Sequence, residues 1–470
     1  MTRINTNVSS LVAQNNLGRT NNQLQESLTR LSTGLRINAG SDDPAGLIAS
    51  ETLRRDITAI GKAITNSERA GQLISTADSA LGQVSNLLND IRGLVTEAAN
   101  EGALSDEQIG ANQLQIDASL TAIDRISQVT SFQGRQVLDG SFDFIVDANP
   151  ATVEDLQINE ATLNDSDVRT VDVVINAAAE QAQLTVGGAG TPLVGDLVFQ
   201  LSGETGSEAF TFDAGATLDQ IVDAVNLATD TTGVTATNNA GVLELDSVGY
   251  GEDAFVAVDV ISEDTGGGGL FGANLSALRD EGVDIDAIIN GVQANGDGNT
   301  LSINTSTLSI SITVSDGDST ALNFDITGGG AKFQLGGDVV RSQQARLGIQ
   351  SVNTANLGGA SGRLYELRTG GAKALDTDTS GAANVVDEVI TKVATIRGRL
   401  GAFKATTLGS NIVSLQDSLA NLTDAESSIR DADFASETAA LTRSQILVQS
   451  GLSVLGIANS NPQNALSLLR

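Results

Sequence analysis

The stretch SLTRLSTGLRINAGSDDPAGLIAS, residues 27–50, predicts the end of one helix and the beginning of the next. Leucines recur at steps of three and four before Gly34, and glycine commonly ends a helix. Asp43 then suits an N-cap, and Pro44 suits the first helical position, where a missing N–H costs nothing. The stretch therefore predicts two consecutive helices separated by a tight connection.

The helix before Gly34 is unusual because few of its side chains are charged. Residues 1–41 contain four arginines and one glutamate, and most of the other polar side chains are Asn, Gln, Ser and Thr. A helix that faces bulk water normally carries more charge, so we expect both of its faces to be covered. The predicted packing residues of this helix are Ile4, Val8, Leu11, Leu24, Leu28 and Leu31.

The second helix is predicted to be long, because its apolar seam continues from Leu53 to Ala98. At 1.5 Å per residue, the whole element is on the order of 80 Å long, which implies a rod rather than a globule. A capping box at Ser105 and Gln108 then predicts a third helix. The predicted rod-packing residues of the second helix are Ile57, Ile60, Ile64, Leu81, Leu88 and Ile91.

The C-terminal flank mirrors this plan, with spacings typical of coiled coils. The predicted packing residues of its rod helix are Val393, Ile396, Leu400 and, after a shift of register, Leu415 and Leu419. The last helix, roughly Ala435 to Ala458, is almost free of charge, and Pro462 lies beyond its predicted end. Its predicted packing residues are Leu441, Val448, Leu452 and Leu455. Antiparallel pairing of the two flanks would leave the middle of the chain inserted at the tip.

The middle of the chain differs from the flanks in charge and in pattern. Residues 144–331 contain 30 acids and two bases, and so hold −28 of the net charge of −32. Segments such as VDVVIN (171–176) and LSISITV (308–314) have the alternation or β-branching of strands, and a capping box at Thr217 and Gln220 predicts a short helix among them. We therefore predict an α+β fold, in which the paired flanks form a long antiparallel coiled-coil rod and carry a β-rich insertion at its tip.

These changes of pattern divide the chain into three predicted domains. Residues 1–43 with 430–470 form a terminal coiled-coil domain, and residues 44–143 with 333–429 form a helical rod domain with a β-hairpin. Residues 144–332 form one or more acidic, β-rich surface domains.

Composition excludes several classes of function. The chain has no His and no Cys, which removes Ser-His-Asp triads, Cys nucleophiles, the usual zinc sites and disulfides. Only chemistry by carboxylate, Lys, Ser, Thr or Tyr side chains remains open. The strong negative charge repels nucleic acids and anionic membranes, no apolar run is long enough for a membrane span, and MTRINTNVSS lacks the features of a cleaved signal peptide.

Two acidic pairs and a glycine run were considered as binding sites. Asp284 with Asp286, and Asp316 with Asp318, lack the spacing of an EF-hand, so we interpret them as solvated acidic surface and predict no metal site. The glycines at 266–269 are not followed by the Lys-Ser/Thr of a phosphate-binding loop.

Both flanks resemble bacterial flagellin, the subunit of the flagellar filament. The matching stretches are INTNVSSLVAQNNL (4–17), SLTRLSTGLRINAGSDDPAGLIAS (27–50), IDRISQVTSFQGRQVLDG (123–140), FQLG (333–336), SVNTANLG (351–358), IRDADFASETAALTRSQILVQSG (429–451) and NPQNALSLLR (461–470). In the middle, TLDQIVDAVNLAT (217–229) resembles an insertion repeat of some flagellins and hook-associated proteins.

The resemblance implies a self-assembling filament subunit that serves motility. Paired terminal helices would line the filament core, the next helices would form an outer tube, and the middle would project. The alternative is a hook–filament junction protein of the same family, although the closing SLLR and the fit of the 27–46 region favour the filament subunit. An enzyme carried on a filament would need a His-rich zinc motif, which this chain lacks, so we predict neither an enzyme nor a cofactor.

The resemblance also implies a location and a set of partners. The chain would be exported to the extracellular filament without cleavage of a signal peptide, through the flagellar export apparatus. Its partners would be further copies of itself, an export chaperone, the filament cap and the hook-junction proteins.

A possible contact with innate immunity is implied in the same way. Flagellins recognised by the vertebrate toll-like receptor carry an arginine where this chain has Asp90, and a glutamate where it has Gln115, whereas Leu94 matches. The resemblance therefore implies weak recognition through this surface.

Overall fold

The computed structural model describes residues 6–100, 102–147, 153–164, 166–187, 193, 195–264, 271–315, 317 and 321–467. The chain forms two compact units. Unit 1 comprises Met1–Arg69, Gln334–Gln343 and Ala405–Arg470, and unit 2 comprises Ala70–Phe333 and Gln344–Lys404. Ile4, one of the predicted packing residues, lies outside the described residues, as do Asp316, Asp318 and the glycines at 266–269.

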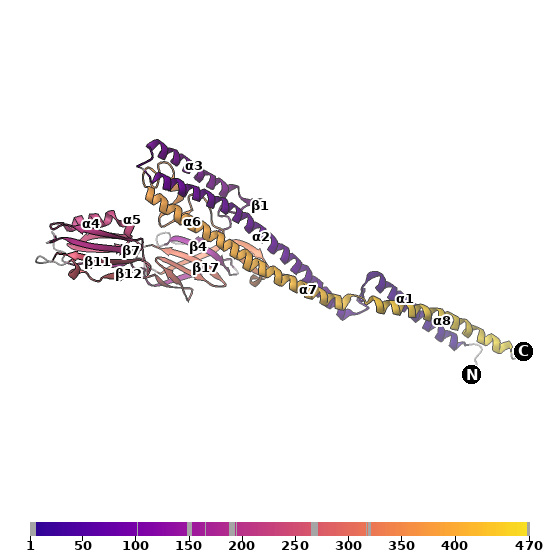
Figure 1. Cartoon of the computed structure of the whole chain (residues 1–470). Coiled ribbons are helices and arrows are strands. Elements are labelled where there is room, and N and C mark those ends of the chain that lie inside the picture. The colour runs from indigo at the N-terminus through magenta and orange to yellow at the C-terminus, as the bar shows by residue number, and fades with distance from the viewer. Residues whose placement is uncertain are drawn as a thin grey trace. The chain divides into compact units, whose positions relative to one another are not determined.

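Long helices make up most of the two flanks (Figure 1). They are α1 (Val8–Thr33), α2 (Pro44–Ala98), α3 (Asp106–Val129), α6 (Thr379–Ala402), α7 (Ser410–Arg430) and α8 (Phe434–Ser467), with short α4 (Leu218–Leu227) and α5 (Thr229–Thr232) in the middle. Single 3₁₀ turns are η1 (Gly272–Asn274), η2 (Arg341–Gln343) and η3 (Leu364–Leu367).

The predicted helix ends are confirmed where a local signal marks them. Gly34 adopts a left-handed conformation with φ of 73°, and its N–H donates to Arg30 O at 2.8 Å. The Asp43 carboxylate accepts the Gly46 N–H at 2.9 Å, as an N-cap does. At α4, the Thr217 N–H donates to Gln220 Oε1 at 2.9 Å, which confirms that capping box.

The last helix is longer than predicted. We expected it to end near Ala458, before Pro462, but α8 continues through Pro462 to Ser467. Pro462 has no N–H to donate to Ala458 O, four residues earlier, but that oxygen accepts the side-chain amide of Asn7 at 2.7 Å instead. The prediction of this boundary was therefore wrong by about two turns.

The predicted shift of register in the C-terminal flank corresponds to a change of helix type. Residues Phe403–Gly409 are π-helical and connect α6 directly to α7. Phe403 and Leu408, which are five positions apart, are both buried. Because a π-helix forms its hydrogen bonds from residue i to i+5, this segment accommodates one more residue between two inward-facing positions than an α-helix does.

The middle of the chain is built from strands, as predicted, and these strands pair antiparallel. The strands between the helical flanks are β3 (Phe144–Asp147), β4 (Val153–Ala161), β5 (Arg169–Ala177), β6 (Gln183–Val186), β7 (Leu197–Gly203), β8 (Ser207–Phe212), β9 (Val234–Asn239), β10 (Val242–Ser247), β11 (Phe255–Glu263), β12 (Arg279–Glu281), β13 (Asp286–Ile289), β14 (Val292–Gln293), β15 (Asn295–Asp297), β16 (Thr300–Asn304), β17 (Leu308–Val314) and β18 (Leu322–Gly329). The flanks add short pairs: β1 (Ser131–Phe132) with β2 (Arg135–Gln136), then β19 (Ala331–Gln334) with β20 (Gln344–Leu347), and β21 (Gly358–Gly359) with β22 (Gly362–Arg363).

These strands form two β-domains with separate cores. β-domain 1 consists of the sheets β14-β13-β5-β18-β3 and β15-β16-β17-β4, whose inward-facing Val, Ile and Leu residues pack together. β-domain 2 consists of the sheets β6-β10-β9 and β12-β11-β7-β8 with α4 and α5. Its core contains Phe199, with the Phe271 ring centroid 5.1 Å away. The number of β-domains, which the sequence left open, is two.

Candidate assembly surfaces

The two terminal helices pair antiparallel within unit 1 (Figure 1). Near one end of the pair, Ser10 Oγ donates to Asn459 Oδ1 at 2.7 Å, and Asn7 Nδ2 donates to Ala458 O at 2.7 Å. Near the other end, a guanidinium nitrogen of Arg30 lies 2.9 Å from Glu437 Oε1. The residues that this pair buries are small: Ser10, Ala13, Ser27, Ser444 and Ala458.

The large apolar side chains of the pair lie mostly away from this small-residue contact. Val8, Leu11 and Leu452 are between 55% and 61% exposed in the single chain, and Leu28 is 48% exposed. The remaining predicted packing residues in the described part are half-buried: Leu24, Leu31, Leu441, Val448 and Leu455. Val12, Ile446, Val454 and Ile457 are exposed as well. Exposed apolar side chains in this density are typical of a surface that another protein covers.

A compact connection joins the terminal pair to the rest of unit 1. Leu35 forms a β-bridge with Asp431, the Arg36 N–H donates to Arg430 O at 2.7 Å, and the Ala432 N–H donates to Gly34 O at 2.9 Å. The Asp42 carboxylate accepts two backbone N–H groups, from Ala39 at 2.9 Å and Asn38 at 3.0 Å, which lower its pKa. These bonds explain why the 34–46 stretch is not a free linker.

The predicted rod-packing residues differ between the two units. In unit 2 all of them are buried: Leu81, Leu88, Ile91, Val393, Ile396 and Leu400. In unit 1 all of them are only half-buried: Ile57, Ile60, Ile64, Leu415 and Leu419. Unit 2 thus has a completed apolar seam in the single chain, whereas unit 1 has an incomplete one.

Polar side chains of α3 hold an irregular segment of unit 2, a role that periodicity did not reveal. Asp124 accepts the Thr354 N–H at 2.8 Å, and Asp117 accepts the Thr369 N–H at 3.0 Å. Gln113, which is buried, donates to Leu367 O at 2.7 Å and accepts the Leu375 N–H at 2.9 Å. The periodic spacing of apolar residues does not reveal these polar side chains, because their partners are backbone groups more than 200 positions away in the sequence.

The receptor-surface residues also lie in unit 2. Asp90 and Leu94 are on α2, and Gln115 is on α3; Asp90 and Gln115 are exposed and Leu94 is half-buried. Arg92, two positions from Asp90, forms an ion pair with Asp387 at 2.7 Å.

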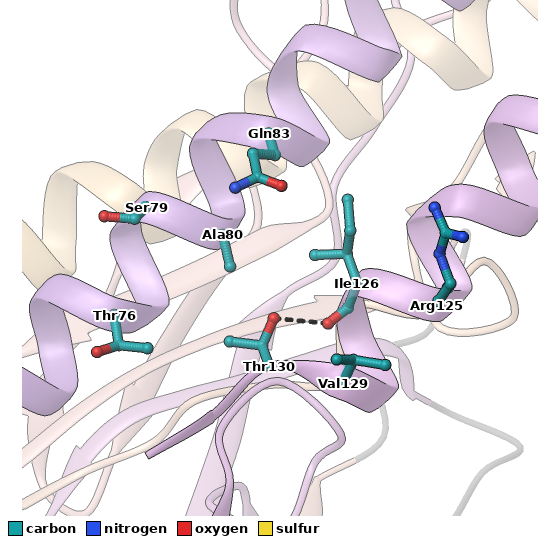
Figure 2. Close-up of a pocket in the computed structure, with 8 residues that line it drawn as sticks. All are labelled: Thr76, Ser79, Ala80, Gln83, Arg125, Ile126, Val129 and Thr130. Carbon is teal, nitrogen blue, oxygen red and sulfur yellow. Dashed lines mark hydrogen bonds between the residues drawn. The ribbon is translucent and has the colours of Figure 1, made fainter.

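A groove of about 570 Å³ lies between α2 and α3, and Figure 2 shows the side chains that line it. Its walls come from both helices: Thr76, Ser79, Ala80, Gln83, Arg125, Ile126, Val129 and Thr130. Val129 is 70% exposed, and the hydroxyl of Thr130 donates to Ile126 O at 2.6 Å, so it is engaged within its own helix. Arg125 is the one ionisable group in this lining, so the groove offers no acid–base pair for catalysis.

Three partly buried ionisable groups of unit 2 are Asp143, just before β3, Glu160 on β4, and Arg399 on α6. Burial raises the pKa of the Asp143 carboxyl and lowers the pKa of Arg399 to about 10, while their mutual attraction opposes both shifts. Burial alone raises the pKa of the Glu160 carboxyl. Within the described ranges, no cluster of three acidic residues is arranged to hold a metal ion.

The structure corrects the interpretation of Asp284 as solvated acidic surface. Its carboxylate is half-buried and accepts backbone N–H groups from Glu252 at 3.0 Å and Gly298 at 2.9 Å. Asp286 is exposed, as expected. Among the helices that the structure describes, none combines the length and hydropathy that a membrane crossing requires.

Three family models match the chain. The bacterial flagellin N-terminal helical region matches residues 4–143, the bacterial flagellin C-terminal helical region matches 383–469, and the flagellin hook IN motif matches 198–249. The last match falls within β-domain 2, which contains the capping box at Thr217.

Full-length relatives agree with these matches. A flagellin of Salmonella typhimurium is 30% identical, and the B-type flagellin of Pseudomonas aeruginosa is also 30% identical; in each case the alignment covers 99% of both chains. Among solved structures, FlgL of Xanthomonas campestris is 12% identical over 79% of this chain and 97% of its own, with a TM-score of only 0.28.

Helical regions matched at both ends, together with relatives aligned over 99% of their own length, define a structural protein of the bacterial flagellum. The chain belongs to the bacterial flagellin family. It is a structural subunit that self-assembles into the flagellar filament, outside the cell, and so serves motility. The alternative of a hook–filament junction protein is not favoured, because the full-length relatives are flagellins.

Proposed function

We propose that copies of this chain pack in the filament core through the outer faces of the α1–α8 pair. The observation that carries this proposal is the exposure of Val8, Leu11, Leu28 and Leu452 in the single chain, where the buried residues of the helix pair are all small. Burial of these side chains against neighbouring copies would remove apolar surface from water in every subunit of the lattice.

The same reasoning assigns roles to the other parts of the chain. The half-buried seam of unit 1, which includes Ile57 and Leu415, would be completed by neighbouring copies, whereas the buried seam of unit 2 stabilises the subunit itself. Residues 1–43 with 430–470 would form the core domain, 44–143 with 333–429 the rod domain, and 144–332 the filament surface. The acidic surface domains would lie on the outside of the filament, in contact with the solution. Dissolved salt there screens the repulsion between charges that are more than about 10 Å apart.

Truncation of exposed leucines tests the core assignment. Leu11→Ala with Leu452→Ala should leave the helix content of the monomer almost unchanged, because both side chains are more than half exposed there. In a filament each truncation should cost about 2 kcal/mol or more per subunit, so pelletable polymer should disappear. Leu227→Ala, at a 90% exposed leucine of α4, is the matched control and should polymerise normally. Equal polymer yield from the unaltered chain, the double variant and the control would refute the assignment.

We further propose that the chain is exported with its N-terminus intact and that it has no catalytic role. Its partners would be its own copies, an export chaperone, the filament cap and the hook-junction proteins. The intact mass of subunits recovered from filaments tests the export proposal. A mass that requires removal of an N-terminal segment would contradict it.

We propose that Asp90, Leu94 and Gln115 form an innate-receptor surface that binds weakly. The exposure of Asp90 and Gln115 supports an accessible surface on the single chain.

A further inference from the structure

The two β-domains are joined at three places rather than by a single tether. The chain passes from β-domain 1 to β-domain 2 after Ala177 and returns before Asp286. The third connection is not covalent: the loop between β10 and β11, residues 248–254, reaches back from β-domain 2 to β-domain 1.

The two covalent crossings are hydrogen-bonded to each other. The Glu180 N–H donates to Val283 O at 2.8 Å, and the Val283 N–H donates to Glu180 O at 3.0 Å, which forms an isolated antiparallel bridge. Two crossings held side by side resist twisting better than two independent linkers do.

The returning loop is anchored in both directions. Tyr250 packs against the core of β-domain 1, although its own strands belong to β-domain 2. The next residue, Gly251, donates its N–H to Glu180 O at 3.2 Å. The loop is therefore held to a crossing as well as to the neighbouring core.

One carboxylate oxygen connects all of these parts. Asp284 lies on the returning crossing, and its Oδ1 accepts the N–H of Glu252 from the loop at 3.0 Å. The same oxygen accepts the N–H of Gly298, in the turn between β15 and β16 of β-domain 1, at 2.9 Å. The Ile285 N–H donates to Gly298 O at 3.0 Å and continues this contact along the chain.

Glycines make the close approach possible. Gly251 has φ of +97°, and a Cβ there would lie 2.7 Å from Gly298 Cα. The backbones of the two β-domains thus pass at a distance that leaves no room for a side chain.

We propose that the two β-domains form one rigid body and that Asp284 is the positioning residue that fixes β-domain 2 on β-domain 1. A filament subunit built in this way presents β-domain 2 in one defined orientation. The two β-domains of the acidic insertion then move together as one body and do not reorient independently of each other.

Distance measurements between two spin labels test the proposal in the full-length chain. Because the protein has no cysteine, Leu227→Cys in β-domain 2 and Asn304→Cys in β-domain 1 provide two unique labelling sites, both exposed. The otherwise unaltered chain should give one narrow distance distribution. Asp284→Ala should broaden that distribution and should speed amide exchange at Gly298 and Glu252 by about tenfold or more, because both N–H groups lose their acceptor.

Two further variants separate positioning from general destabilisation. Asp284→Asn keeps an acceptor oxygen in place and should restore the narrow distribution, and Asp286→Ala, at the exposed neighbouring acid, should leave it unchanged. A broad distribution in the unaltered chain would overturn the proposal. An Asp284→Ala variant that keeps a narrow distribution would overturn it as well.

Discussion

Arg30 and Glu437 join the two ends of the chain: they lie 407 positions apart in sequence and 2.9 Å apart in the structure. Both side chains are mostly covered, and the hydrogen bond to Glu437 raises the pKa of Arg30. In a helix pair with so few charged residues, we expect this ion pair to fix which residue of α1 lies opposite which residue of α8.

Glu437→Ala should destabilise the terminal pair. It removes the one carboxylate on α8 that contacts Arg30, while Glu26, at 2.6 Å, lies on α1 itself, so the link between the two helices is lost at a cost of about 1–2 kcal/mol. Amide exchange in α1 and α8 of the monomer should accelerate accordingly. Arg55→Ala, which removes a well-exposed cation that pairs with Asp56, is the control and should change exchange little. Equal protection in both variants would show that the pair does not set the register.

Removal of residues 144–329, which form the two β-domains, should leave filament assembly intact. The Gly330 N–H donates to Asp143 O at 2.9 Å, so the chain enters and leaves this segment at adjacent points. A short Gly-Ser linker from Asp143 to Gly330 should therefore preserve the helical flanks and remove most of the negative charge. Electron micrographs should show thinner filaments that need less salt to form. A variant that folds but forms no filaments would contradict the proposed surface location of residues 144–332.

Glu160→Gln should change how stability depends on pH. Since burial raises the folded-state pKa of Glu160, the folded state holds this proton more tightly than the unfolded state. The group therefore destabilises the fold above its folded-state pKa, and this penalty disappears as the pH falls below its unfolded value of about 4.3. Because the side chain is partly exposed, solvent screening should limit the gain of Glu160→Gln at pH 7 to a few tenths of a kcal/mol. Urea unfolding at pH 4 and pH 7 measures the difference in unfolding free energy between the variant and the unaltered chain. Glu154→Gln, on the same strand, is the control.

Asp90→Arg should strengthen the response of a toll-like-receptor reporter to the monomer. It replaces an exposed negative charge by a positive one on the proposed receptor surface, and a charge reversal in an interface can change binding by several kcal/mol. Gln83→Arg, at another exposed position of α2, controls for the added charge. A full response from the unaltered chain would contradict the proposal.

Local signals in the sequence predicted the helix ends because short-range chemistry decides them. Gly34, Asp43 and Thr217 each make the hydrogen bond or adopt the backbone angle that their positions implied. The alternating segment LSISITV was likewise predicted at its observed bounds, as β17.

Features that depend on distant partners were not predictable in this way. The helical seam placed Leu11 and Leu452 among packing residues, yet the small residues Ser10 and Ser444 are the ones buried in the single chain. Asp284 was interpreted as solvated because its two amide donors lie 32 and 14 positions away and carry no side-chain signature. The path of α8 beyond Ala458 was missed because a single proline was given too much weight.

The π-helical segment Phe403–Gly409 means that residue counts do not measure helical phase across this part of the chain. A relative with one residue fewer between Phe403 and Leu408 could present the same inward face through an unbroken α-helix. Alignments that force equal spacing here would pair inward-facing positions with outward-facing ones. Chimeric subunits exchanged at this point should therefore be joined by matching the buried residues on either side, with the gap placed inside the wide turn.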